Sequence, residues 1–110
     1  MANFESIKEY KRKSVLITST SSTTPININI VLSKYDYLIL RITNSAGTTI
    51  YGSDIVLVDA IKDNDLIDII RYFNVLSGNF TGTLKHNTGN SFSISSSNSN
   101  YVVEVYGIEK

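Results

Sequence analysis

The sequence predicts an all-β protein: an antiparallel β-sandwich with seven or eight strands. The β-branched residues Ile, Val and Thr are abundant, together with seven Tyr and four Phe, and such residues suit the half-buried surface of a pleated sheet. Ser, Asn and Gly fill the segments between the apolar runs, where turns need them. The apolar runs are short and recur at a spacing of roughly 8–12 residues, as in sandwiches and barrels.

The first strands are predicted in the N-terminal half. Residues 14–19 form a short apolar run that ends in a Ser/Thr-rich loop. After this loop three Ile alternate with two Asn, at Ile26, Ile28 and Ile30 against Asn27 and Asn29. This period of two predicts a strand with one dry and one wet face.

Residues 35–43 predict a strand with two partly apolar faces. Leu38, Leu40 and Ile42 would share one face, because side chains alternate along a strand. The other face would carry Tyr37, Ile39 and Arg41. We therefore place this strand in the centre of a sheet or under cover on both sides.

The strands that follow are separated by turn residues. Asn44 to Gly47 predicts a hairpin turn. Gly52 and Ser53 predict a break or bulge between two strand segments, residues 48–51 and 54–59. Further strands are expected at residues 80–86, 91–96 and 101–108, with turns at residues 77–79, 87–90 and 97–100.

Residues 63–73 fit two kinds of structure. Four apolar residues between Leu66 and Phe73 match the i, i+3, i+4, i+7 stripe of a helix, which Asp63 or Asn64 would cap. However, Ile, Tyr and Phe are weak helix formers. We therefore expect one short helical turn near residues 63–72, followed by a strand.

Length and charge limit the function. The 110 residues suffice for one core, so we divide the chain into an N-terminal arm or docking segment, residues 1–13, and a single β-sandwich domain, residues 14–110. Ten acidic and ten basic residues balance, which argues against nucleic acid as a partner. Cysteine is absent, so disulfides and thiolate chemistry are excluded. No apolar run approaches ~18 residues and no signal peptide is evident, so we expect no membrane partner and synthesis in the cytoplasm.

The sequence offers no catalytic motif. His86 is the only histidine, and beside Asn87 and a turn we expect it to be exposed and without a catalytic role. A zinc site would need carboxylates from distant loops, and the Gly-x-Ser-x-Gly nucleophile motif is absent. We therefore predict a protein without enzymatic activity, catalytic residues or cofactors.

An acidic cluster raises the question of calcium. Asp63, Asp65 and Asp68 present oxygen ligands at a spacing that suits this ion. The cluster lacks the Gly and the distal Glu of an EF-hand loop, and loop solvation or helix capping accounts for it equally well. We therefore predict no metal site.

Tyrosines are the residues most suited to recognition. Six of them lie in or beside predicted strands: Tyr35, Tyr37, Tyr51, Tyr72, Tyr101 and Tyr106. Aromatic faces near Asn and Asp hold sugars, but cores and subunit interfaces also use them, and we favour these two roles. As candidate ligand-binding residues we keep Tyr37, Tyr51 and Tyr72.

Several strands are apolar on both faces, which predicts association of copies. A sandwich buries only its inner faces, and large exposed apolar patches are unusual on monomers. The last strand is the candidate seam, since it runs almost to the end of the sequence, where chains usually fray. The oligomer interface would use Tyr101, Val103, Val105, Tyr106 and Ile108.

Four segments support a family resemblance. They are Tyr-Asp-Tyr-Leu-Ile-Leu at residues 35–40, Thr-Thr-Ile at 48–50, Phe-Ser-Ile-Ser-Ser-Ser at 92–97 and Val-Glu-Val-Tyr-Gly-Ile at 103–108. Their order resembles that of small β-sandwich virion proteins of tailed bacteriophages, of the receptor-binding tip, head fibre or tail fibre type. The resemblance covers roughly residue 35 onward and is a pattern of strand types, in which no single motif is specific.

This resemblance implies a structural or host-attachment role in a virion. It implies a jelly-roll-like fold and a homotrimer, with other virion proteins and a host cell-surface glycan as further partners. The chain has no coiled-coil or collagen-like shaft, so it would be a tip, collar or decoration protein, and residues 1–13 would dock it. The alternative function is a carbohydrate-binding β-sandwich module, which requires exposed Tyr side chains beside Asn, Asp or Arg.

Overall fold

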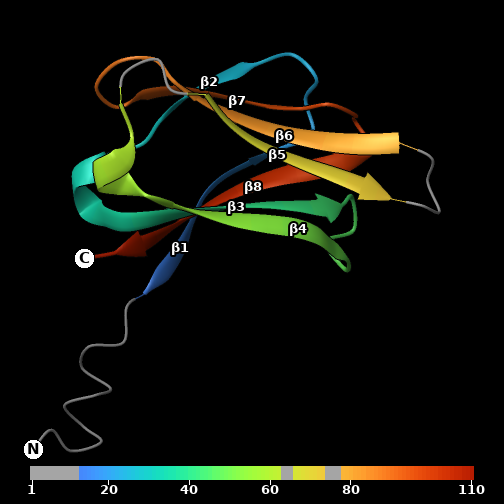
Figure 1. Cartoon of the computed structure of the whole chain (residues 1–110), viewed down its shortest axis with the longest axis horizontal. Helices are drawn as coiled ribbons and strands as arrows, with labels where there is room; N and C mark the ends of the chain where they lie inside the picture. The colour runs from blue at the N-terminus through green and yellow to red at the C-terminus, as the bar shows by residue number, and fades with distance from the viewer. Residues whose placement is uncertain (1–12, 63–65, 74–77) are drawn as a thin grey trace, which may run out of the picture.

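The computed structural model describes residues 13–62, 66–73 and 78–110, with the backbone alone for 66–73 and 78–80. Across these residues the chain forms eight strands and two single 3-10 turns, η1 (Leu32–Lys34) and η2 (Val58–Ala60). The strands form two antiparallel sheets that lie one above the other (Figure 1). The predicted all-β sandwich is therefore confirmed. No helix in this part of the chain is long and apolar enough to span a membrane.

The two sheets each contain strands from both halves of the chain. Sheet A has the order β1 (Ser14–Thr20), β8 (Tyr101–Glu109), β3 (Tyr35–Asn44) and β4 (Ile50–Leu57). Sheet B has the order β2 (Ile26–Asn29), β7 (Ser91–Ser96), β6 (Gly78–His86) and β5 (Leu66–Phe73). The first described strand thus pairs with the last one and the second with the seventh, whereas β3 with β4 and β5 with β6 form hairpins.

The region that fitted two structures is a strand where it is described. Residues 66–73 pair along their whole length with β6, from Leu66 opposite Lys85 to Phe73 opposite Gly78. Pairing with β6 therefore gives a strand, in agreement with the β-propensity of Ile, Tyr and Phe and against the helical stripe. A helical turn is absent from residues 66–72, and residues 63–65 lie outside the described part of the chain.

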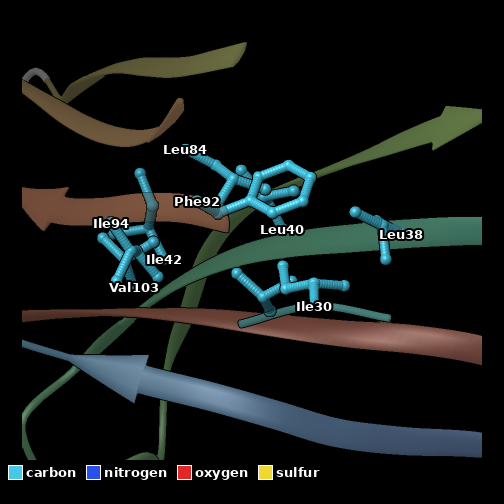
Figure 2. Packing of buried hydrophobic residues seen from close by; sticks show 9 residues of the cluster. Ile30, Leu38, Leu40, Ile42, Leu84, Phe92, Ile94 and Val103 are labelled. Atoms are coloured by element: carbon cyan, nitrogen blue, oxygen red, sulfur yellow. The ribbon is translucent and has the colours of Figure 1, made fainter. Parts of the chain in front are cut away.

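Alternation along the central strands builds the core, as predicted. Leu38, Leu40 and Ile42 of β3 and Val103 and Val105 of β8 point toward sheet B and are at most 1% exposed. Sheet B supplies the remaining members of the cluster in Figure 2 together with the segment after β2: Ile30, Leu84, Phe92 and Ile94. Burial of each such side chain stabilises the fold by about 1.5–3 kcal/mol.

The β3–β4 hairpin confirms the expected turn, whereas Gly52 and Ser53 pair regularly and the irregularity lies just before them. Gly47 adopts a φ of 72°, and its N–H donates to the carbonyl of Asn44 at 3.0 Å. The Asn44 carboxamide oxygen accepts from the amide of Thr48 at 2.9 Å, which holds the turn. The two predicted segments form one strand, β4, in which the pairing shifts around Tyr51 and leaves it as an extra residue.

Candidate functional site

The outer face of sheet A, which points away from sheet B, presents a row of apolar side chains across all its strands. Leu16 of β1 pairs with Tyr106 of β8, and Tyr106 pairs with Ile39 of β3. Ile39 pairs in turn with Ile55 of β4. Opposed residues of an antiparallel pair lie on the same face with Cβ atoms about 4.5–5.5 Å apart, so these side chains form a continuous strip.

A second row runs beside the first, two residues further along each strand. Ile108 pairs with Tyr37, and Tyr37 pairs with Leu57. Ser14, opposite Ile108, ends this row with a hydroxyl group. We call the apolar residues of both rows the apolar face: Leu16, Tyr37, Ile39, Ile55, Leu57, Tyr106 and Ile108.

The apolar face is open to solvent in the single chain. The exposed fraction is 68% for Ile55, 49% for Leu16, 47% for Leu57 and 37% for Tyr37. Contiguous apolar surface of this kind is uncommon on soluble monomers and marks sites where another molecule binds. This face is therefore the candidate functional site.

A charged pair borders the two apolar rows. Arg41 pairs with Glu104 across β3 and β8, and its Nε lies 3.4 Å from the Glu104 Oε1. These two atoms are inaccessible to solvent and their ion pair does not have hydrogen-bond geometry. The Arg41 guanidinium carbon lies 5.3 Å from the Tyr106 ring centroid, and the Tyr106 hydroxyl donates to the Glu104 Oε2 at 3.4 Å. The charges thus compensate each other within one chain, while a partly exposed pair of this kind adds at most about 1 kcal/mol of stability.

The outer face of sheet B has the opposite character along its described side chains. Asn27 of β2 pairs with Ser93 of β7, and Ser93 pairs with Lys85 of β6. Neighbouring outward positions carry small polar groups as well: Asn29, Ser91, Ser95 and Thr83. Along the described side chains the two outer faces therefore differ: sheet A is apolar, while β2, β6 and β7 carry hydroxyl and amide groups and one lysine.

The structure divides the predicted interface residues of the last strand between two faces. Tyr106 and Ile108 belong to the apolar face. Val103 and Val105 are 0% exposed and lie in the core, so a partner could not contact them, and their assignment to an interface needs correction. Tyr101 packs against the core and makes an edge-to-face contact with Tyr51, with 5.3 Å between ring centroids. The cause is the alternation of β8, which turns odd-numbered residues inward.

The candidate ligand-binding tyrosines do not form a common platform. Tyr37 lies on the apolar face, whereas Tyr51 packs against the core. They occupy opposite ends of the β3–β4 pair, because Tyr37 is opposite Leu57 and Tyr51 lies beside the Ile42–Gly52 pair. The side chain of Tyr72 lies outside the described residues.

His86 is buried, at 3% exposure, so the expectation of an exposed residue was wrong. The alternation of β6 places it on the same inward side as Leu84, and its ring stacks on Phe92 with 4.4 Å between centroids. Nδ1 lies 2.9 Å from the carbonyl oxygen of Lys62, and Nε2 lies 2.7 Å from that of Gly89. A neutral ring donates to one of these carbonyls and an imidazolium donates to both. The side chain therefore ties two loops to the core, which is a structural role.

Two predicted features fall partly outside the described residues. Asp63 and Asp65 of the acidic cluster lie outside the described residues, and Asp68 is described only by its backbone. Among the side chains that the structure does describe, no group of three His, Cys, Asp or Glu could hold a metal ion. Of the predicted arm, residues 1–12 lie outside the description, while the carbonyl of Lys13 accepts from the amide of Glu109 at 2.9 Å.

Sequence reasoning missed three of the seven residues of the apolar face. It named Tyr37, Tyr106 and Ile108 but assigned no role to Leu16, Ile55 or Leu57. The available signal was the apolar character of both faces of residues 54–59. Comparisons of the chain with protein-family models, with curated proteins and with solved structures found no match.

Proposed function

We propose that this protein is a non-enzymatic structural component of a tailed-bacteriophage virion, of the fibre, tip or decoration type, and that it acts by homo-oligomeric assembly. The observation that carries the proposal is the apolar face of sheet A. Removing apolar surface from water is favourable by about 25 cal/mol for each Å² buried. Assembly is the economical way to cover it.

Two further features support a role in assembly over a role in catalysis. The one histidine holds two loops in place through both ring nitrogens. The tyrosines kept as ligand candidates do not converge on one site, since Tyr37 and Tyr51 lie on different sides of the sheet. The tailed-phage assignment itself rests on the resemblance of the strand pattern.

The first test is the solution mass of the purified chain, measured by light scattering after size exclusion. We expect three copies of the 12.2 kDa chain. A monomer at every concentration up to about 100 μM, far above the dissociation constants typical of stable complexes, would contradict assembly. A monomer that binds glycans and loses binding on Tyr37→Ala would favour the alternative of a carbohydrate-binding module.

The virion assignment needs its own test. Antibodies raised against the chain should label purified particles of the virus that encodes it, at a regular position visible by electron microscopy. An oligomeric protein that is abundant in infected cells and absent from particles would contradict the virion role while leaving assembly intact.

A further inference from the structure

We infer that the apolar faces of the copies turn toward the symmetry axis of the oligomer and pack against one another there, with the outer face of sheet B turned to solvent. This inference rests on the proposed homo-oligomeric assembly and adds which surface makes the contact. Three properties of the described residues lead to it: the charge balance of the face, its area and the contrast with sheet B.

The charge balance of sheet A permits contact between identical surfaces. When copies meet through the same face, charges near the symmetry axis come close to like charges of the other copies, and like charges repel. The two apolar rows contain no charged residue. Beside them, Arg41 and Glu104 already neutralise each other at 3.4 Å within one chain. A second copy therefore meets a face without net charge, so its own identical face is an acceptable partner.

The area of sheet A is sufficient for a specific contact. Its longest strand, β3, has ten residues and so extends about 33 Å, and four strands cover a width of about 19 Å. The planar area is then roughly 600 Å² for each copy, and two such faces together reach the lower end of stable interfaces, about 1,200 Å². Part of this area would be the polar row with Arg41 and Glu104, which suits the rim of an interface.

The most exposed apolar side chain also lies where a neighbour would meet it. Ile55 stands on β4, at the edge of sheet A, and is 68% exposed, while its cross-strand partner Ile39 is half-buried. A protruding aliphatic side chain beside a flatter apolar strip can insert between the rows of another copy. Among the described outward side chains of β2, β6 and β7, the Asn, Ser and Thr groups offer no such anchor, since they are small and polar.

Charge insertion at this anchor tests the inference. The double variant Ile55→Lys and Leu57→Lys places two cations on an exposed strand edge, where folding should be retained. We expect the wild-type chain to be oligomeric and this variant to be a folded monomer, with a dissociation constant raised at least 100-fold. The matched control, Asn27→Lys with Ser93→Lys on sheet B, should keep the wild-type mass.

The outcomes separate the inference from the proposed function. If the wild type is oligomeric and the sheet A variant keeps its mass, the face is not the interface, and assembly uses another surface. If the wild type is a monomer, both ideas are wrong. Circular dichroism and thermal melting would show whether each variant is folded.

A second readout does not depend on tolerance of the lysines. The native chain has no cysteine, so a single Ile55→Cys or Asn27→Cys substitution provides one thiol for maleimide labelling. We expect the thiol at position 55 to react at least tenfold more slowly in the oligomer than in diluted, dissociated protein. The thiol at position 27 should react at the same rate in both. Equal rates at position 55 in the two states would overturn the inference.

Discussion

One glycine at the contact between the sheets sets how closely they pack at that point. Gly82 of β6 faces sheet A, and a Cβ atom at this position would lie 2.9 Å from Cγ2 and 3.1 Å from Cγ1 of Val103. It would also lie 3.3 Å from Cγ1 of Ile42. Val103 is fully buried and its χ1 angle is stiff, so the clash cannot be relieved by a simple rotation. The missing side chain therefore allows the two sheets to approach each other here.

The first prediction concerns this contact. Gly82→Ala should lower the free energy of unfolding by about 1–3 kcal/mol, because it overpacks the core. Val103→Ala should also destabilise the protein by leaving a cavity. The double variant should lose less free energy of unfolding than the sum of the two single losses. The reason is that the smaller side chain at position 103 leaves space for the added Cβ at position 82. Urea unfolding of all variants measures these values.

A control and a contrary result are available for this pair. Thr83→Ala, the next residue along β6 and on the outer side, should change stability by less than about 1 kcal/mol. Strict additivity of Gly82→Ala and Val103→Ala would show that the residues do not compete for the same space.

Strand β8 has an unusual place for a segment near the end of the sequence. It lies between β1 and β3, and the amide of Lys110 donates to the carbonyl of Lys34 at 3.1 Å. The edges of sheet A are formed by β1 and β4, and those of sheet B by β2 and β5. A strand that is bonded on both sides can open only when two ladders break together, whereas an edge strand needs to break one.

The second prediction follows from this placement and concerns hydrogen exchange. Amides of residues 102–108 in β8 should exchange at least about tenfold more slowly than those of the edge strand β2, because opening β8 requires near-global unfolding. Exchange followed by NMR or mass spectrometry measures both rates. Exchange of β8 as fast as that of β2 would mean that the last strand frays independently of its neighbours.

For single strands, the sequence predicted which residues share a face better than it predicted which other strands pack against that face. The period of two correctly separated Leu38, Leu40 and Ile42 from Tyr37, Ile39 and Arg41, because alternation is a local property of the backbone. Strand order depends on contacts between distant segments, so the core position of Val103 could not be read from residues 101–108 alone. His86 was misjudged for the same reason: its neighbours Asn87 and Gly89 are turn residues, while the partner that buries it, Phe92, belongs to another strand.

The β-sandwich as a whole has two outer surfaces of different character. Sheet A presents the apolar face, and strands β2, β6 and β7 of sheet B present Asn, Ser and Thr groups with one lysine. The described chain starts and finishes at the same end of sheet A, where Ser14 is opposite Ile108. Figure 1 shows β1 and the C-terminus close together at that end.

The third prediction uses this proximity in a circular permutant. A short Gly-rich linker would join Lys110 to Lys13, and new ends would open in the exposed turn at residues 97–100 between β7 and β8. These two strands belong to different sheets, so no ladder is cut. We expect the same fold and faster refolding by stopped-flow fluorescence of tyrosine, because the β1–β8 pairing becomes local.

A permutant opened within β8, between Val103 and Glu104, serves as the control and should fail to fold because a central strand is divided. If both permutants fold equally well, the position of β8 in sheet A does not determine the integrity of the sandwich.

The pairing of β1 with β8 has a consequence for synthesis on the ribosome. At about 5–20 residues per second, several seconds separate the translation of residues 14–20 from that of residues 101–109. During this interval β1 has no partner in sheet A. Leu40 and Ile42 also lack their cross-strand neighbours in β8, Val105 and Val103. The nascent protein therefore cannot complete its sandwich strand by strand, and a chaperone that shields these β-branched segments until residue 109 emerges would raise the yield of folded protein.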